Sequence, residues 1–179
     1  MKNKKACLIG NPNVGKSSLF NFLTGSLQHT GNWTGKTVAN EVGKCVYQSV
    51  CWDLIDLPGM YSLIYQSPEE EVASDFVFLE KYDLAIVVAD ATNLERSMEI
   101  ILEVLDVTDH VIVCLNLIDE ARKRNILVDP QELMEKLQVP VIATSVKEKI
   151  GLQELIETMN KEYIWHPKEI THSPKIERY

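Results

Sequence analysis

The sequence has 179 residues, of which 45% are hydrophobic, and a formal net charge of −8, which suits one soluble globular domain with a substantial core. The acidic balance argues against a partner that is bound through nucleic-acid phosphates. No apolar window approaches the roughly 18 residues of a membrane-spanning helix, and the apolar run behind the basic first residues is too short for a signal peptide.

The four cysteines, Cys7, Cys45, Cys51 and Cys114, lie in strand-like runs and lack the spacing of metal ligands. This pattern is typical of small buried side chains in a reducing compartment. Cys45 and Cys51 are close enough in sequence to face each other across a hairpin.

Apolar runs alternate with amphipathic patterns along the chain. Strands are expected at residues 6–9, 41–47, 49–55, 84–89, 111–116 and 139–143. Helices are expected at residues 16–23, 69–79, 94–106, 129–137 and 152–162. Continuous Val, Ile and Leu runs joined by helices indicate a parallel sheet covered on both faces. The sequence therefore predicts an α/β fold with a six-stranded, mostly parallel sheet, one antiparallel edge hairpin, and a ligand at the carboxyl ends of the strands.

Residues 10–17, Gly-Asn-Pro-Asn-Val-Gly-Lys-Ser, match the P-loop pattern G-x-x-x-x-G-K-[ST] between an expected strand and an expected helix. Gly10 and Gly15 allow the backbone to turn its N–H groups toward phosphate oxygens. Lys16 supplies a charge to the β- and γ-phosphates, and the Ser17 hydroxyl can bind magnesium. The expected nucleotide contacts in this loop are Gly10, Asn11, Pro12, Asn13, Val14, Gly15, Lys16, Ser17 and Ser18.

A second motif, Asp56-Leu57-Pro58-Gly59, ends the third expected strand. Asp56 can hold magnesium directly or through water, and the Gly59 N–H can contact a γ-phosphate. Many GTPases place Gln directly after this motif to orient water, whereas this chain has Met60, whose thioether cannot do so. Hydrolysis of a bound nucleoside triphosphate is therefore expected to be slow in the absence of an activating partner.

Base recognition is predicted at the next two strand ends. In Asn116-Leu117-Ile118-Asp119, the Asp119 carboxylate can accept two hydrogen bonds from guanine, which adenine does not offer. Asn116 would brace the loop and approach N7, and Leu117, where Lys is usual, would cover one face of the ring. Backbone N–H groups of Ser145, Val146 and Lys147 would meet the guanine O6.

The polar segment 28–40 links the first helix to the edge hairpin and could fold over the nucleotide. Thr37 is the expected magnesium ligand and γ-phosphate sensor of this segment, the alternative being an ordinary Thr at a strand entry. The expected contacts here are Gly35, Lys36, Thr37, Val38 and Ala39.

Together these motifs resemble a Ras-like P-loop GTPase of the translation-factor-related class. Residues 31–38, Gly-Asn-Trp-Thr-Gly-Lys-Thr-Val, are similar to Gly-Asn-Trp-Pro-Gly-Val-Thr-Val of one family, the cytosolic G domain of FeoB, the bacterial ferrous iron transport protein B. Residues 56–63, followed by Ser-Pro-Glu-Glu at 67–70, resemble the second switch of that family. The chain departs from this pattern at Thr34, Lys36 and Ala39. These differences affect the expected motion of the first switch, but they remove no group that binds phosphate or a metal ion.

The resemblance covers about residues 4–164 and implies GTP hydrolysis coupled to ferrous iron uptake. It implies a G domain at 1–164 and a linker, or the truncated start of a helical domain, at 165–179. Its expected partners are GTP, GDP, and the helical and membrane transport domains of a longer protein, at the cytoplasmic face of the cell membrane, with no nucleic acid; the fragment itself is expected to be soluble. Lys16, Thr37, Gly59 and Asn13 are the expected catalytic groups, and Ser17, Thr37 and Asp56 the magnesium ligands.

Three questions stay open at this point. Asn13 lies at the P-loop position where some related GTPases use Asn to bind potassium. Asn also favours turns, however, and could simply brace the loop. A ribosome-assembly or tRNA-modification GTPase shares the Asn-Val-Gly-Lys-Ser P-loop, although the acidic charge and the lack of an RNA-binding module argue against it. A nucleotide-binding module that never turns over is the remaining alternative.

Overall fold

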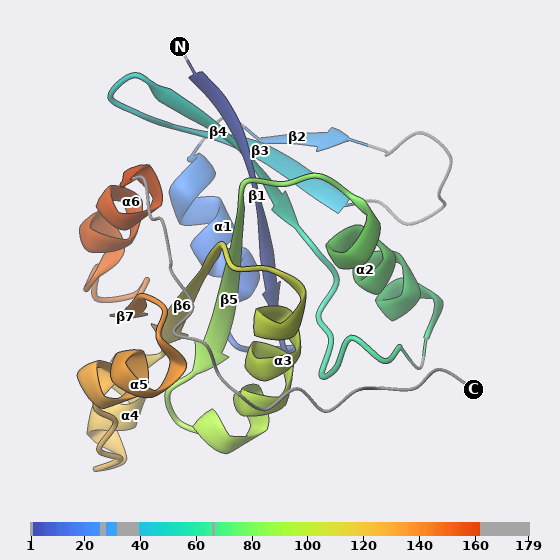
Figure 1. Cartoon of the computed structure of the whole chain (residues 1–179). Coiled ribbons are helices and arrows are strands. Elements are labelled where there is room, and N and C mark those ends of the chain that lie inside the picture. Colours follow the sequence, from blue (N-terminus) through green and yellow to red (C-terminus); the bar gives the residue numbers. More distant parts are fainter. Residues whose placement is uncertain (1, 26–27, 32–39, 66, 162–179) are drawn as a thin grey trace.

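The computed structural model describes residues 2–25, 28–31, 40–65 and 67–161, and within them it contains seven strands and six helices (Figure 1). In chain order they are β1 (Lys2–Gly10), α1 (Lys16–Thr24), β2 (Gln28–Gly31), β3 (Asn40–Tyr47), β4 (Val50–Asp56), α2 (Pro68–Leu79), β5 (Leu84–Asp90), α3 (Leu94–Val107), β6 (Val111–Asn116), α4 (Ile118–Lys123), α5 (Pro130–Leu137), β7 (Val141–Ala143) and α6 (Leu152–Asn160).

The strands form one sheet in the order β2-β3-β4-β1-β5-β6-β7. Strands β4, β1, β5, β6 and β7 are parallel to one another, and β3 returns antiparallel to β4 as the predicted hairpin. All six expected strands are present. The seventh, β2, lies where the sequence predicts a loop; it pairs antiparallel with β3, so the hairpin is not at the edge of the sheet. Its sequence, Gln-His-Thr-Gly, lacks the alternating apolar pattern that would have indicated a strand.

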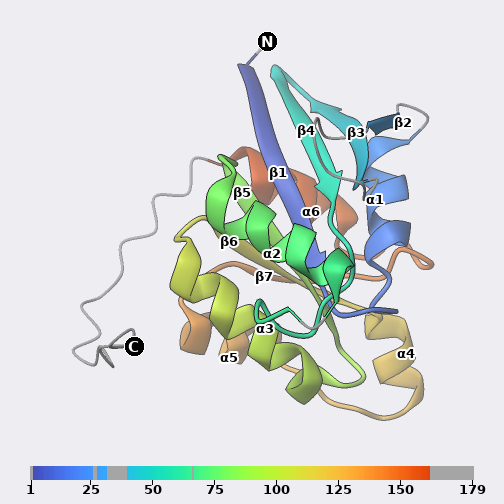
Figure 2. The ribbon, with the colours of Figure 1, turned by 90° about the vertical axis from the view of Figure 1, so that its right-hand side faces the viewer.

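Different helices cover the two faces of the sheet, as Figures 1 and 2 show. Side chains alternate along β1, so Ala6 and Leu8 pack with α1 and α6, whereas Cys7 and Ile9 pack with α2 and α3. The parallel strands carry continuous apolar runs because helices cover both of their faces. This is the predicted doubly covered architecture.

The helix starts follow local capping signals. The Ser67 hydroxyl accepts a hydrogen bond from the Glu70 N–H at the start of α2, with Pro68 as the first helical residue. Asp129 caps α5 in the same way, again followed by proline. The sequence does not predict helix α4, because its six residues are too few to show an amphipathic pattern.

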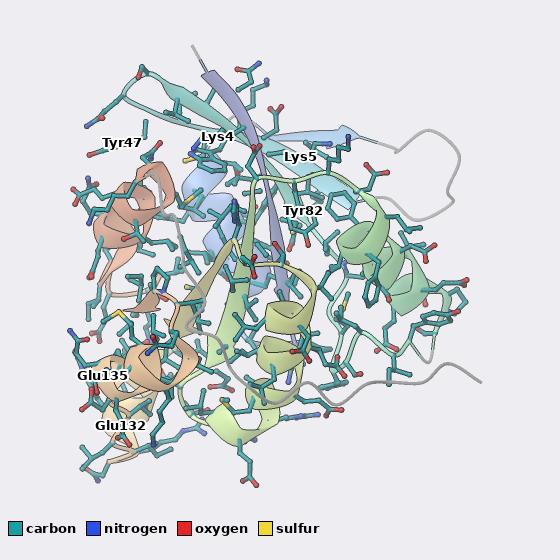
Figure 3. All side chains as sticks on the ribbon, in the orientation of Figure 1. Lys4, Lys5, Tyr47, Tyr82, Glu132 and Glu135 are labelled. Atoms are coloured by element: carbon teal, nitrogen blue, oxygen red, sulfur yellow. The ribbon has the colours of Figure 1, made fainter. Side chains whose placement is uncertain are left out.

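The predicted site motifs lie at the carboxyl ends of the parallel strands, since β1 ends at Gly10, β4 at Asp56 and β6 at Asn116. The opposite end of the sheet carries Lys4, Lys5 and Tyr47, which Figure 3 labels. There the Tyr47 hydroxyl lies 3.3 Å from Nε2 of Gln153, which ties the β3–β4 hairpin to α6.

The cysteines are buried and free, as expected, but Cys45 and Cys51 do not face each other. In the β3–β4 register Cys45 is opposite Trp52, and Cys51 is opposite Val46. Adjacent positions of a strand point to opposite faces, so the two thiols lie on different sides of the sheet. None of the helices within the described ranges is long and apolar enough to span a bilayer.

Candidate nucleotide-binding site

The P-loop bounds a cleft of about 420 Å³ at the carboxyl end of β1. Its lining consists of Asn11, Pro12, Asn13, Gly15, Lys16, Ser17, Ser18 and Gly59. Gly15 has a φ of 82°, and a Cβ there would lie 2.4 Å from Nδ2 of Asn116. Only glycine fits both that conformation and that contact. Helix α1 begins at Lys16, so its free N–H groups and positive dipole end face the cleft.

Lys16 and Ser17, which line this cleft, both bond to Asp56. The Lys16 ammonium donates to Oδ1 of Asp56 and to the carbonyl oxygen of Leu57, and both side chains of the ion pair are more than nine-tenths buried. The Ser17 hydroxyl donates to the other oxygen of Asp56, Oδ2, at 2.9 Å. Residues about 40 apart in sequence thus bring an ammonium, a hydroxyl and a carboxylate together at the strand ends where the two motifs lie.

The Gly59 backbone packs against the P-loop. A Cβ at Gly59 would lie 3.1 Å from the backbone of Pro12, which is tighter than most Cβ contacts in proteins. Gly59 therefore approaches the loop more closely than most residues with a side chain could. The next N–H, that of Met60, donates to the Gly10 carbonyl at 3.0 Å. The Met60 side chain is fully buried in the core cluster under α2 and α3. Met60 therefore points away from the cleft and serves packing.

Asn116 connects the P-loop to the predicted base-binding loops. Its Nδ2 donates to the Val14 carbonyl at 2.9 Å, and its Oδ1 accepts from the Thr144 hydroxyl at 3.1 Å. Thr144, which belongs to none of the predicted motifs, also contacts the Cys114 thiol at 3.1 Å. Each side-chain amide group of Asn116 has a partner, so this residue fixes the relative positions of three loops.

Asp119 lies beside these loops in the first turn of α4 and is 4% exposed. Hydrogen bonding by the Ser145 side chain, the largest influence, lowers the pKa of Asp119 below its usual range, against the opposing effect of burial. Smaller contributions come from Lys123, 3.7 Å away, and Lys147. The carboxylate is therefore ionised and acts as an acceptor at neutral pH.

The other residues predicted to contact the guanine base lie near Asp119, but one of the predicted N–H donors is already engaged. Leu117, in the left-handed conformation that starts α4, lies next to Gly15. The Ser145 N–H already donates to the Ile150 carbonyl at 3.1 Å, so it is engaged within its own turn. The N–H groups of Val146 and Lys147 remain the ones predicted to meet the guanine O6.

The two asparagines of the P-loop differ in their surroundings. Asn11 is 2% exposed; its Nδ2 donates to the Arg96 carbonyl at 2.9 Å, and its Oδ1 has no partner within the described part of the chain. Asn13 is exposed and has a φ of 67°, a left-handed conformation that Asn tolerates better than most residues. The backbone alone thus accounts for an Asn at position 13.

The expected contacts from the first switch, Gly35, Lys36, Thr37, Val38 and Ala39, lie outside the described residues, and so does the segment 165–179. Every other residue of the predicted site lies at the same edge of the sheet. Helix α3 also contributes to the site: Arg96 and Glu103 contact the loops that carry the motifs, and no motif in the sequence marks either residue.

A parallel sheet with a P-loop at β1, an aspartate at the end of the neighbouring strand and an Asn-x-x-Asp motif at β6 defines a domain with the Ras-like GTPase fold. Comparison with known proteins narrows this class. The family model of ferrous iron transport protein B matches residues 4–159, and the chain belongs to that family.

Individual relatives agree. The chain is 39% identical over 174 residues to the Fe(2+) transporter FeoB of Staphylococcus aureus strain MSSA476, and the match covers 96% of this chain and 26% of the relative. It is 40% identical over 159 residues to the Fe(2+) transporter FeoB of Escherichia coli strain K12, covering 87% of this chain and 21% of that protein. The chain thus spans about a quarter of the length of the curated relatives it matches.

Solved structures show the same likeness. The G domain of the T. maritima FeoB iron transporter matches with a TM-score of 0.82 and 44% identity, over 88% of this chain and 96% of that one. The cytosolic domain of the same transporter in its GMPPNP form matches with a TM-score of 0.84 and 42% identity, over 92% of this chain and 67% of that one.

Proposed function

We propose that this chain binds GTP and hydrolyses it to GDP and phosphate, as the regulatory G domain of a ferrous iron transporter. The observation that carries the proposal is that the buried, ionised Asp119 lies at the same edge of the sheet as Lys16, Ser17 and Asp56, which are in contact with one another. One end of this arrangement suits guanine and the other suits a magnesium-bound triphosphate.

The donor set fits magnesium. Ser17 and Asp56 offer hard oxygen ligands 2.9 Å apart, and Mg²⁺ is commonly bound by one or two protein oxygens together with phosphates and water. Among the described residues no cluster of three or more His, Cys, Asp or Glu could hold a metal ion by itself. Thr37, outside the described residues, is proposed as the third oxygen ligand. When bound, magnesium neutralises charge that develops on the β- and γ-phosphate oxygens.

The residues of the chain have separate roles in this proposal. Lys16, which lines the cleft, exchanges its contacts with Asp56 and Leu57 for phosphate oxygens. P-loop N–H groups and the α1 dipole bind the phosphates, and the Gly59 N–H binds the γ-phosphate. Met60 supplies no group for the attacking water because it is buried in the core. Turnover is therefore proposed to be slow, with water held by the first switch backbone.

Asn13 is proposed as a potassium ligand. Its exposed side chain lines the cleft, where an amide oxygen and phosphate oxygens could hold a cation together. A cation at that point would offset charge between the β- and γ-phosphates, as an arginine finger does in other GTPases.

The transport role rests on the family. Solved relatives include the T. maritima cytosolic domain in GDP and GMPPNP forms, and the full-length relatives are named as Fe(2+) transporters. We propose that the chain works at the cytoplasmic face of a membrane, joined through residues 165–179 to a helical domain and a transport domain, with hydrolysis coupled to iron passage.

The test is calorimetric titration with GTP, GDP and ATP in magnesium, followed by single-turnover phosphate release. We expect guanine nucleotides to bind at least about a thousandfold more tightly than ATP, and Lys16→Ala to abolish binding, while Lys44→Ala, at an exposed ion pair on β3, leaves binding unchanged. Equal affinities for GTP and ATP would refute guanine recognition. Tight GTP binding without phosphate release would favour the module that never turns over.

A further inference from the structure

The Glu103 side chain of helix α3 binds the chain segment that follows Gly59. Glu103 accepts a hydrogen bond from the Ser62 hydroxyl at Oε1, at 2.8 Å, and from the Leu63 N–H at Oε2, at 2.5 Å. The Ser62 oxygen in turn accepts from the Ile64 N–H at 3.0 Å. A single carboxylate thus holds two consecutive residues, and both bonds are strengthened because the acceptor carries a charge.

Further contacts make this segment a short, doubly anchored span. Leu63 is 5% exposed in the core, and its carbonyl accepts from the Ser74 hydroxyl of α2 at 2.7 Å. At the other end the Met60 N–H is bonded to the Gly10 carbonyl. Between these anchors Tyr61 is exposed and Ser62 is half-buried, and the centroid of the Tyr61 ring lies 4.5 Å from the guanidinium carbon of Arg96 on α3. Helix α3 therefore holds the segment through two side chains.

The anchored span bears directly on Gly59. Gly59 is adjacent to the Met60 anchor and lies against Pro12 in the wall of the phosphate cleft. If the span were loose, a γ-phosphate that bonds the Gly59 N–H would have to order residues 59–63 on binding, at a cost in conformational entropy. A diphosphate has no group that reaches for Gly59 and would not bear that cost.

We propose that Glu103 is a positioning residue that preorganises Gly59 for the γ-phosphate and so sets the preference of this domain for nucleoside triphosphate over diphosphate. The inference rests on the proposed function, since it concerns the nucleotide site described above. Glu103 itself contacts no part of that cleft; it acts through Ser62 and Leu63.

The experiment compares GMPPNP and GDP affinities of the wild type with those of Glu103→Ala, Glu103→Gln and Ser62→Ala, by calorimetry in magnesium. Glu99→Gln is the matched control, because Glu99 is an exposed acid one turn earlier on α3. We expect Glu103→Ala to lose about tenfold in GMPPNP affinity, the size of one hydrogen bond to a charged group, and less than about twofold in GDP affinity. Glu103→Gln keeps an acceptor and a donor at the same position, so it should lose less.

The outcomes are distinguishable. Equal losses for both nucleotides, or an unchanged ratio of affinities, would overturn the positioning role while leaving the proposed function intact. A wild type that binds neither guanine nucleotide would overturn both. If Glu103→Ala does not fold, Glu103→Gln and Ser62→Ala decide the matter by the same ratio, and a change in ratio for Glu99→Gln as large as theirs would count against Glu103.

Discussion

Replacement of Asp119 by Asn tests the base end of the site most directly. The substitution keeps the size of the side chain but replaces one acceptor oxygen by an NH₂ group, which would meet a donor of guanine. Each hydrogen bond to a charged acceptor contributes ~1.5–3 kcal/mol, so loss of the pair should weaken GTP binding by ~10²–10⁴-fold. Xanthine presents an acceptor where guanine has its amine, so xanthosine triphosphate should become the better ligand.

The surroundings of Asp119 support that range. The residue is 4% exposed, so water cannot replace the lost acceptor. Its lowered pKa means that the carboxylate stays charged well into the acid range. The folded pKa lies below the unfolded one, so the stability this gives is complete above the ordinary carboxyl range and is lost as pH falls through the lower folded pKa. Guanine preference should accordingly be constant from pH 7 to about 5.

The assay is competition of GTP, ATP and xanthosine triphosphate for the wild type and Asp119→Asn. Glu120→Gln is the control, because Glu120 is the adjacent acid of α4 and pairs with Lys123 at 2.8 Å instead of facing the base. A variant Asp119→Asn that still prefers GTP to xanthosine triphosphate, or a Glu120→Gln protein with the same loss, would refute the assignment of Asp119.

Three further predictions concern the phosphate end and the core. Asn13→Ala should remove any rate advantage of potassium over sodium in single-turnover phosphate release, and identical wild-type rates in the two salts would contradict a potassium site. Met60→Ala should lower the free energy of unfolding by ~2–5 kcal/mol, because it leaves a cavity in the core, while hydrolysis by the folded protein changes less than about tenfold; denaturant titration and single-turnover kinetics check both. Burial raises the pKa of Cys7 and Cys114 to about 12, so neither thiol should react with iodoacetamide at pH 8 until urea unfolds the protein, and labelling of the native protein at these positions would be the contrary result.

Much of the site could be read from the sequence because its chemistry is local to short motifs. The P-loop and the Asp56 motif each combine a strand end with fixed residue types, and both predictions of where these lie are confirmed by the fold. The six expected strands follow from continuous apolar runs, which a sheet covered on both faces requires. The strand ends of a parallel sheet share one edge, so motifs far apart in sequence could be expected to converge there.

Tertiary structure alone decided the contacts that join those motifs. That Asn116 holds Val14 and Thr144, and that Asn11 bonds the Arg96 carbonyl, depends on strand order and helix packing, which leave no local pattern in the sequence. The same holds for Met60, which stands where many GTPases have a Gln that orients water. The packing of the fold decides the direction of its side chain, and that side chain lies in the core.

The carboxylates of Asp119 and Glu103 show most clearly what the sequence specifies and what the tertiary structure adds. The sequence by itself determined that a carboxylate stands at Asp119 and another at Glu103, and marked only the first as functional because it belongs to a motif. The structure decided that Glu103 holds the segment behind Gly59, since a hydrogen bond between residues 40 apart exists only once α3 is packed against that segment. Periodicity and motifs specify elements and local chemistry, whereas long-range partners are fixed by the packing of the whole fold.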